Sequence, residues 1–261
     1  MSLKGKIALI TGGSRGIGQA ITSKLASEGA DVIINYLRKR ETADKTAQTI
    51  REKGVSVHLI RANLAEPEKI DQMFKEIEEE FGRLDILINN AASGVARSAM
   101  ELDTDGWDWT MDINARAALL CAQHAAKLMK NGGVIINISS LGSHLVMSSY
   151  TAVGVSKAAL EALTRYLAVE LAPRGIRVNA VSAGAVESEA LKLYANDPNI
   201  PKPAITNTPA GRMVLGEDIA NLVVFLCSEN ALMIRGQTII IDGGLSLSSL
   251  AYQIRTNNKG A

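Results

Sequence analysis

Short apolar runs alternate with amphipathic segments almost from one end of this 261-residue chain to the other. The apolar runs consist mainly of Val, Ile and Leu without alternating polar residues, a pattern typical of strands that are covered on both faces of a sheet. Strands and helices that follow one another through short connections favour a parallel sheet with helices on both sides. The sequence therefore predicts one doubly wound α/β domain with a seven-stranded parallel sheet and helices on both faces.

The expected strands lie at residues 6–11, 31–36, 55–61, 84–89, 134–139, 176–182 and 237–242. The expected helices run from the turn after the first strand to about residue 26, and over about 41–53, 66–81, 104–130, 149–171 and 217–227. No repeat or linker interrupts this pattern, so residues 1–250 are expected to form one domain and the polar segment 251–261 a frayed tail.

Residues 183–215 interrupt the alternation of strands and helices, because this long and weakly patterned connection holds four of the six prolines. A long loop in a compact domain is more often a lid or a binding loop than a filler. We therefore expect a substrate-binding lid here, with an ordinary surface excursion as the alternative.

The charge balance and the cysteine count exclude several classes of protein. Lys and Arg number 28 against 27 Asp and Glu, whereas binding to nucleic acid or to an anionic membrane needs an excess of basic residues. Two cysteines are too few for a disulfide scaffold and fit a reducing compartment. The N-terminus lacks a signal-peptide core, and the longest apolar runs, such as residues 222–227, are too short to span a membrane. We expect a soluble, cytoplasmic protein.

A glycine-rich turn follows the first strand and opens the first helix. Glycines at such a turn allow a tight bend, a close approach of the backbone to phosphate, and close packing of helix on strand. The free N–H groups at the helix start favour an anion. A glycine turn alone is weak evidence, but the strand before it and the helix after it favour nucleotide binding by a Rossmann-type domain. Contacts are expected from Gly12, Ser14, Arg15, Gly16, Ile17 and Gly18.

The charge after the second strand indicates which nucleotide is bound. An NAD enzyme places an acid at the end of this strand, whereas an arginine there accommodates the 2′-phosphate of NADP. Here Arg38 and Lys39 follow the strand end, and Asp31 lies several residues too early. Arg15 in the turn is a second arginine for the same phosphate, which arginine forks bind strongly. These residues favour NADPH, although Lys39 alone would also fit a solvated basic loop.

Four further motifs complete a family pattern: Asn89-Asn90-Ala91-Ala92, Asn114, Asn137-Ile138-Ser139-Ser140 and Asp242-Gly243-Gly244. Together with the glycine turn, they resemble the short-chain dehydrogenase/reductase family over about residues 5–247. The resemblance implies further cofactor contacts from Asn63, Leu64, Asn90, Ala91, Lys157, Val186 and Ser188.

The chain departs from this family at the tyrosine. The family pattern is Tyr-x-x-x-Lys, but Val153 stands four residues before Lys157, and Tyr150 stands seven before it. This spacing resembles the third class of bacterial enoyl-acyl carrier protein reductases, which use NADPH. Residues seven apart share a helix face, and the tyrosine lies about 4.5 Å further along the axis than at the usual spacing. A hydroxyl further from the nicotinamide suits conjugate reduction, in which hydride goes to the β-carbon.

The resemblance implies a reaction and a role for each residue. Hydride from NADPH reaches the β-carbon of a trans-2-enoyl thioester, while the Tyr150 hydroxyl donates a hydrogen bond to the thioester oxygen as charge develops there. Lys157 binds the nicotinamide ribose and stabilises charge near the tyrosine. Ser140 and Asn114 are candidates for catalytic support. The expected substrate pocket comprises Tyr150, Ala92, Ser93, Leu191 and Tyr194.

The resemblance also implies partners, namely an acyl carrier protein that carries the enoyl chain and further copies of this chain in a homotetramer. No metal is expected, because Cys121 and His124 share a helix face without a third ligand. Two alternatives stay open: a short-chain carbonyl reductase that acts on 3-ketoacyl groups, and a non-catalytic NADP-binding sensor. The presence of both Tyr150 and Lys157 favours an enzyme over a sensor.

Overall fold

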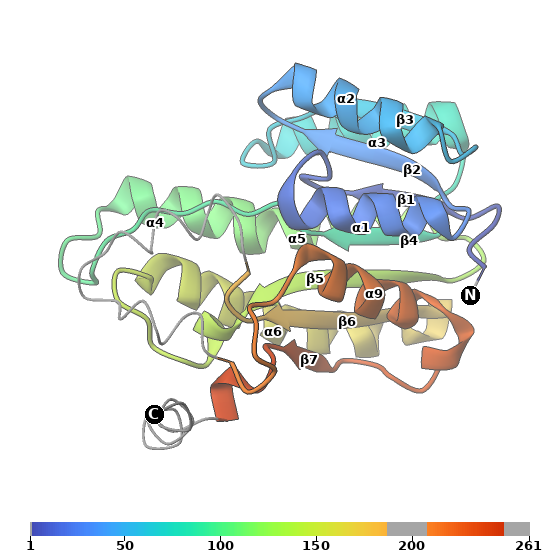
Figure 1. Ribbon diagram of the computed structural model, residues 1–261. Coiled ribbons are helices and arrows are strands. Elements are labelled where there is room, and N and C mark those ends of the chain that lie inside the picture. The colour runs from blue at the N-terminus through green and yellow to red at the C-terminus, as the bar shows by residue number, and fades with distance from the viewer. Residues whose placement is uncertain (1, 187–207, 248–261) are drawn as a thin grey trace.

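The computed structural model describes residues 2–186 and 208–247 (Figure 1). These residues contain one sheet of seven parallel strands in the order β3-β2-β1-β4-β5-β6-β7. The strands are β1 (Ile7–Ile10), β2 (Asp31–Tyr36), β3 (Val57–Arg61), β4 (Ile86–Asn89), β5 (Gly133–Ser140), β6 (Ile176–Ala183) and β7 (Thr238–Ile241). The predicted doubly wound domain with seven parallel strands is confirmed, and most strand ends lie within two residues of the expected ones.

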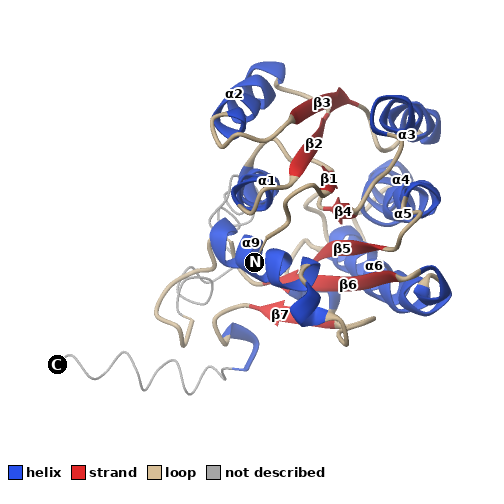
Figure 2. Ribbon diagram, turned by 90° about the vertical axis from the view of Figure 1, so that its right-hand side faces the viewer, coloured by secondary structure: helices blue, strands red, loops and turns tan. Residues whose placement is uncertain are grey.

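Seven α-helices connect the strands within the described part of the chain. They are α1 (Gly16–Ser27), α2 (Arg40–Arg51), α3 (Pro67–Phe81), α4 (Thr104–Met111), α5 (Ala117–Leu128), α6 (Thr151–Glu170) and α9 (Gly216–Cys227). Figure 2 shows α1, α2 and α9 on one face of the sheet and α3, α5 and α6 on the other. The prediction of helices on both faces is therefore confirmed.

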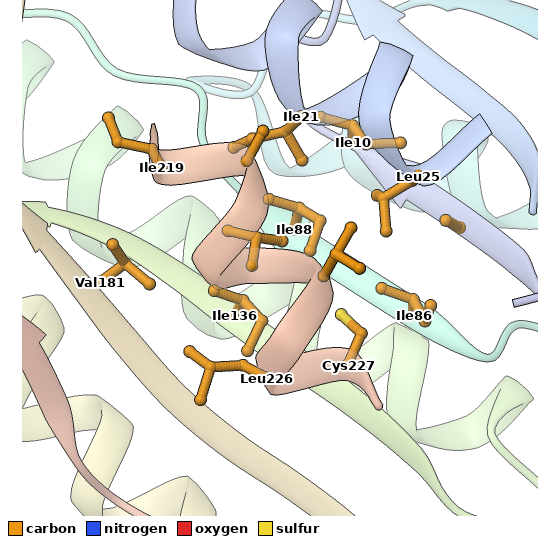
Figure 3. Close-up of a cluster of buried hydrophobic side chains, with 14 of the residues drawn as sticks. Ile10, Ile21, Leu25, Ile86, Ile88, Ile136, Val181, Ile219, Leu226 and Cys227 are labelled. Carbon is orange, nitrogen blue, oxygen red and sulfur yellow. The ribbon is translucent and has the colours of Figure 1, made fainter. Parts of the chain in front are cut away.

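Each face of the sheet has its own apolar core. On one face, Ile21 and Leu25 of α1 and Ile219 of α9 pack against strand side chains such as Ile88 (Figure 3). Leu87, the neighbour of Ile88 on β4, points to the opposite face and packs in the second core, which contains residues of α3, α5 and α6. Because both faces are covered, the strands need no polar side, and this explains their uninterrupted apolar runs.

The order of the strands reverses between β1 and β4. From β1 the chain builds outward to β3 at one edge, and it then returns to β4 on the other side of β1 and continues to β7. All strands are parallel, so their carboxyl ends lie at one edge of the sheet. Folds of this kind bind ligands in the crevice outside the carboxyl ends at such a reversal. The loops that follow β1, β2, β4 and β5 therefore converge on one place.

The helix expected over 104–130 is interrupted. A π-helical turn, Asp112–Arg116, separates α4 from α5, and the chain leaves helical geometry after Leu128. The sequence periodicity did not reveal this turn, because the residues that α4 buries, Gly106 and Thr110, form no apolar face whose shift could be followed into α5. Such π-turns often lie at functional sites.

The helix expected over 149–171 begins at Thr151 and ends at Glu170. Tyr150 precedes it, with a backbone φ of −113° and ψ of 11°. The expectation that Tyr150 belongs to this helix is therefore wrong by one residue. The reason is tertiary, because contacts with other loops fix the backbone at this point, as shown below.

The segment 183–215 is described only at its two ends, 183–186 and 208–215. Most of the predicted lid and the whole of the predicted tail, 251–261, lie outside the described residues, so both stay predictions. In the part of the chain that the structure describes, no helix has the length and the apolar run needed to cross a bilayer.

Candidate functional site

The glycine-rich turn joins β1 to α1 at the carboxyl edge of the sheet. Gly12 and Gly16 have φ values of 61° and 55°, a left-handed conformation that glycine adopts without steric cost. Gly18 lies so close to the loop after β4 that a Cβ at this position would come within 2.6 Å of Asn90 Nδ2. The turn therefore requires glycine for its conformation at two positions and for close packing at the third.

Two side chains that the sequence pattern did not reveal, Thr11 and Asn35, hold this turn in place. Thr11 Oγ1 accepts hydrogen bonds from the backbone N–H groups of Asn90 and Ala91, both at 2.9 Å. Asn35 Oδ1 accepts one from Gly12 N at 3.3 Å. A signal for Asn35 was present in the sequence, because an amide within an apolar strand must find hydrogen-bond partners when it is buried. The turn, the end of β2 and the loop after β4 thus form one connected unit.

The start of α1 is open to an anion. Arg15 precedes the helix with an extended backbone, and within the described residues no side chain caps this end. A Cβ at Gly16 would meet no described atom within 4 Å. The side chain of Ser14 is buried, and Ile17 is half-buried against the core. The N–H groups and the positive end of the helix dipole make such a terminus favourable for phosphate.

Three basic residues, Arg15, Arg38 and Lys39, lie after the ends of the neighbouring strands β1 and β2 and are exposed. Lys39 adopts a left-handed conformation, with φ of 58°, and directly precedes α2. Among the described residues, none of the three is bound to an acid. The next basic residue, Arg40, differs because its Nε donates to Asp44 at 3.0 Å. Arg15, Arg38 and Lys39 are therefore the cations available for a phosphate here.

Asn63 and Leu64 follow β3, in the positions implied for cofactor contacts. Leu64 is buried and lines a small cavity together with Ala91 and Asn114. The amide of Asn63 is used locally, because Nδ2 donates to Glu66 Oε1 at 2.6 Å. The structure thus brings Leu64 to the loop after β4, while the Asn63 side chain holds its own turn.

Tyr150 lies at the end of the loop after β5, directly before α6. Its hydroxyl donates to Ser140 Oγ at 3.3 Å. Its ring lies over Gly142, where a Cβ would come within 2.6 Å of Tyr150 Cδ1. Burial raises the pKa of the Tyr150 hydroxyl, and the hydrogen bond with Ser140 opposes this shift. The structure therefore brings Tyr150 and Ser140 together and favours the protonated hydroxyl.

The backbone that leads into Tyr150 is constrained on both sides. Ser149 has φ of 55°, a left-handed conformation that is uncommon for a residue with a side chain. Tyr150 also forms an isolated β-bridge with Arg97, which in turn is ion-paired with Asp103. These contacts with the loop after β4, rather than the periodicity of α6, decide where the tyrosine lies.

Lys157 lies on the face of α6 that packs against β5. The residue is only 5% exposed, and Nζ donates to Ile138 O at 2.8 Å. Burial lowers the pKa of Lys157 to about 8, while the charge of Glu161 acts in the opposite direction. Lys157 binds Ile138 and Tyr150 binds Ser140, and these two partners are two residues apart at the carboxyl end of β5. Lys157 and Tyr150 therefore both approach this end of the strand.

Val153 occupies the position of the tyrosine in the pattern Tyr-x-x-x-Lys. It is buried against the loop after β4, where a Cβ at Gly94 would overlap the Cγ2 methyl of Val153. An apolar side chain therefore fills this position, and the hydroxyl that reaches Ser140 comes from Tyr150 instead.

Asn114 lies in the π-turn and is 2% exposed. Its Oδ1 accepts from Ser93 N, and its Nδ2 donates to Ser93 O and to Ser156 Oγ, all at 2.9 Å. Ser93 Oγ accepts from Trp109 Nε1, also at 2.9 Å. Asn114 thus ties the loop after β4 to α6, and Ala92 in the same loop is exposed.

Val186 follows β6 and is buried. It forms a β-bridge with Val214, which ties the two described ends of the segment 183–215 to each other. Ser188, Leu191 and Tyr194 lie outside the described residues, so their implied contacts with cofactor or substrate stay predictions.

Among the described residues, no three metal-binding side chains come together. Burial raises the pKa of the Cys121 thiol to about 12. His124 contacts Asp71, with 2.8 Å between Nε2 and Oδ1, and stacks on Phe74.

Comparison with known proteins places this site in context. The family model described as "Enoyl-(Acyl carrier protein) reductase" matches residues 12–246. The chain is 37% identical to 1-cyclohexenylcarbonyl-CoA reductase of Streptomyces collinus, over 93% of this chain and 87% of that protein. It is also 37% identical to the 3-oxoacyl-(acyl-carrier-protein) reductase FabG of Staphylococcus aureus, over 92% and 98%. A short-chain dehydrogenase from Burkholderia cenocepacia in complex with NADP has a TM-score of 0.84 at 35% identity, over 94% of this chain and 100% of that one.

Proposed function

Because the chain belongs to the short-chain dehydrogenase/reductase family, and is thus an NAD(P)-dependent oxidoreductase, we propose that it uses NADPH to reduce the carbon–carbon double bond of trans-2-enoyl thioesters carried on acyl carrier protein. The observation that carries this proposal is the position of the tyrosine. Val153 fills the usual place, and Tyr150 supplies the hydroxyl at Ser140.

The residues present fit NADPH. The uncapped start of α1 and the left-handed glycines leave room and N–H donors for a pyrophosphate. Arg15 and Arg38, exposed and without an acidic partner among the described residues, suit the additional 2′-phosphate. No acid stands at the end of β2 to bind a free ribose hydroxyl, because Tyr36 ends the strand and Leu37 and Arg38 follow it. When bound, NADPH supplies the hydride.

The side chains of the protein stabilise the charge that develops in the reaction and position the reacting groups. The Tyr150 hydroxyl, protonated because burial raises its pKa, donates a hydrogen bond to the thioester oxygen, where negative charge develops. Ser140 Oγ lies 3.3 Å from that hydroxyl, and it orients the Tyr150 oxygen by donating its own proton to it while Tyr150 donates to the substrate. Lys157, held at the end of β5, binds ribose hydroxyls and adds positive charge near the tyrosine. Asn114 holds the loop of Ser93 and supports the pocket wall.

The geometry of the reaction explains why the hydroxyl comes from a displaced tyrosine. In a ketone, the carbon that receives hydride is bonded directly to the oxygen that receives charge. In an enoyl thioester, the β-carbon receives hydride and lies two bonds from the carbonyl carbon. The oxygen is therefore further from the hydride donor. A tyrosine that enters from the loop before α6, while an apolar Val153 fills the usual tyrosine position, suits this longer separation.

Reduction of 3-ketoacyl groups is the second candidate function, and specific observations favour it. The relatives named FabG are 3-oxoacyl reductases with identity equal to that of the cyclohexenylcarbonyl-CoA relative, and their names support ketone reduction more directly than enoyl reduction. In addition, the hydrogen bond between Tyr150 and Ser140 restores a tyrosine–serine pair, which suits a carbonyl oxygen. The substrate of the Streptomyces collinus relative, in contrast, is by its name an α,β-unsaturated thioester.

A comparison of two substrates separates these candidates. NADPH oxidation is followed with an enoyl thioester and with a 3-ketoacyl thioester of the same chain length, both on acyl carrier protein. Wild type is compared with Tyr150→Phe and with Ser27→Ala, which likewise removes one hydroxyl and lies exposed at the end of α1. We expect turnover of the enoyl substrate that Tyr150→Phe reduces about a hundredfold and Ser27→Ala leaves unchanged.

Turnover of the 3-ketoacyl substrate alone would replace the proposal with the second candidate. NADPH binding without turnover of either substrate would favour a non-catalytic sensor.

A homotetramer and docking of the carrier protein are further parts of the proposal. Tyr166 and Val169 of α6 are apolar or aromatic and are 69% and 75% exposed, which supports packing of this helix against another copy. Light scattering of the purified protein tests the tetramer directly.

A further inference from the structure

Glu161 is a carboxylate inside the protein that the proposed mechanism does not use. It lies on α6 and is 2% exposed. Its Oε1 accepts hydrogen bonds from Ser139 Oγ at 2.5 Å and from Ser143 Oγ at 2.6 Å. Its Oε2 lies 2.7 Å from His144 Nε2. A buried carboxylate that accepts several hydrogen bonds is stabilised in its charged form.

Glu161 lies one helical turn after Lys157, on the same face of α6. Both side chains are anchored to successive residues of β5, because Lys157 Nζ binds Ile138 O and Glu161 binds the side chain of Ser139. Two opposite charges are thus buried between the same helix and the same strand. Burial lowers the pKa of Lys157, and the charge of Glu161 opposes that shift.

We propose that Glu161 is a positioning residue that keeps the ammonium of Lys157 charged, and that it acts on the reductase through Lys157 rather than through contact with the substrate. The proposal rests on the role given to Lys157 in the proposed function.

A test must separate the effect of Glu161 on Lys157 from the effects of the other groups that contact Glu161. Lys157 is the cation on the same helix, and His144 is the titratable group from the loop after β5. Ser139 and Ser143 are uncharged. Burial lowers the pKa of Lys157 to about 8, so a test must separate the effect of Glu161 on this group from that of His144.

The decisive experiment measures the charge of Lys157 in the protein without cofactor or substrate. Protein labelled with ¹³C at the lysine ε-carbons is titrated by NMR, and the Lys157 signal is assigned by its loss in Lys157→Met. Glu161→Gln removes the charge and keeps the shape, whereas His144→Ala removes one hydrogen bond to the same carboxylate and keeps the charge. Thermal melting of each variant verifies that it is folded, and Glu161→Met replaces Glu161→Gln if the latter does not fold.

We expect the pKa of Lys157 to fall by about one unit or more in Glu161→Gln and to stay at the wild-type value in His144→Ala. The alkaline limb of kcat/KM should move by the same amount in Glu161→Gln only. An unchanged pKa of Lys157 in Glu161→Gln overturns the proposal, and so does an equal shift in both variants, because that would indicate a structural role of the hydrogen bonds.

Failure of the proposed function would give a different set of results from failure of the pairing between Glu161 and Lys157. A wild-type protein that reduces no enoyl thioester, but whose Lys157 titration depends on Glu161 as stated, would refute the proposed reaction and support the pairing of these two charges.

Discussion

The ring of Tyr150 lies against the backbone of Gly142, so closely that a Cβ at position 142 would stand 2.6 Å from Tyr150 Cδ1. Gly142 belongs to the short turn after β5 that begins at Ser140, the residue whose Oγ accepts the Tyr150 hydroxyl. A glycine in this turn is thus what allows a tyrosine from outside the helix to reach the end of β5.

Gly142→Ala is expected to displace the Tyr150 ring and to lower kcat for the reductase reaction by about a hundredfold, because a displacement of about 1 Å at a reacting group costs this much. Steady-state rates and thermal melting check this expectation. Gly54→Ala is the control, because Gly54 is exposed, has φ of 80° and no neighbour within 4 Å of a Cβ. It should lower stability without changing the rate. Equal rates in wild type and Gly142→Ala would refute the placement of the ring.

Arg38→Gln is expected to weaken NADPH binding about ten- to a hundredfold and to leave NADH binding nearly unchanged, because hydrogen bonds to a charged phosphate contribute about 1.5–3 kcal/mol. Titration calorimetry with both nucleotides measures the two dissociation constants. Arg40→Gln is the matched control, since Arg40 is bound to Asp44 and stays outside the proposed phosphate site. An equal loss of affinity for NADPH and NADH would contradict the assignment of Arg38 to the 2′-phosphate.

The rate should depend on pH through Lys157. Burial lowers the pKa of this group to about 8, so its ammonium is charged below that pH and loses its proton above it. The pKa of Tyr150 is raised, so its hydroxyl keeps its proton over the same range. We therefore expect kcat/KM to be level below pH about 8 and to fall tenfold for each further unit of pH, the dependence for loss of one proton. A profile that stays level to pH 10 would show that the charge on Lys157 is not needed.

Asn114→Ala is expected to lower the free energy of unfolding by about 2–4 kcal/mol, because it leaves buried partners of the amide without hydrogen bonds. The loop that carries Ser93 should loosen as well, so the KM for substrate should rise. Urea denaturation and steady-state kinetics check both effects. Asn230→Ala, at an exposed position near the end of α9, should change stability by less than about 0.5 kcal/mol. A similar small effect at Asn114 would refute its structural role.

The fold could be predicted from the pattern of apolar runs because every strand of this sheet is buried on both faces. The order of elements, their number in the sheet and most of their ends follow from that pattern. The π-turn at Asp112–Arg116 could not be predicted, because the residues that α4 buries are Gly106 and Thr110, and these give no apolar periodicity from which a shift could be read. It is held in part by Asn114, whose partners are 21 and 42 positions away.

The candidate site could be predicted in part. Glycine turns and arginines after a strand indicate a phosphate site from local chemistry alone. Thr11 and Glu161 could not be identified in this way, because their function depends on partners from other elements. The amide of Asn35 indicated a need for hydrogen-bond partners but not which ones. Glu161 is the clearest case, since a Glu on a helix is ordinarily exposed and only the packing of α6 on β5 shows it to be buried.

The sequence by itself determined that this chain forms a doubly wound sheet, that a nucleotide phosphate is favoured after β1, and that its tyrosine stands seven residues before Lys157. These are local properties, set by side-chain polarity and by the backbone freedom of glycine. Only the tertiary structure decided that Tyr150 lies outside α6, against Gly142 and Ser140, and that Glu161 and Lys157 are both buried where α6 packs on β5. Burial and opposing charge are properties of the packed chain, because they depend on what surrounds a group in space and not along the sequence.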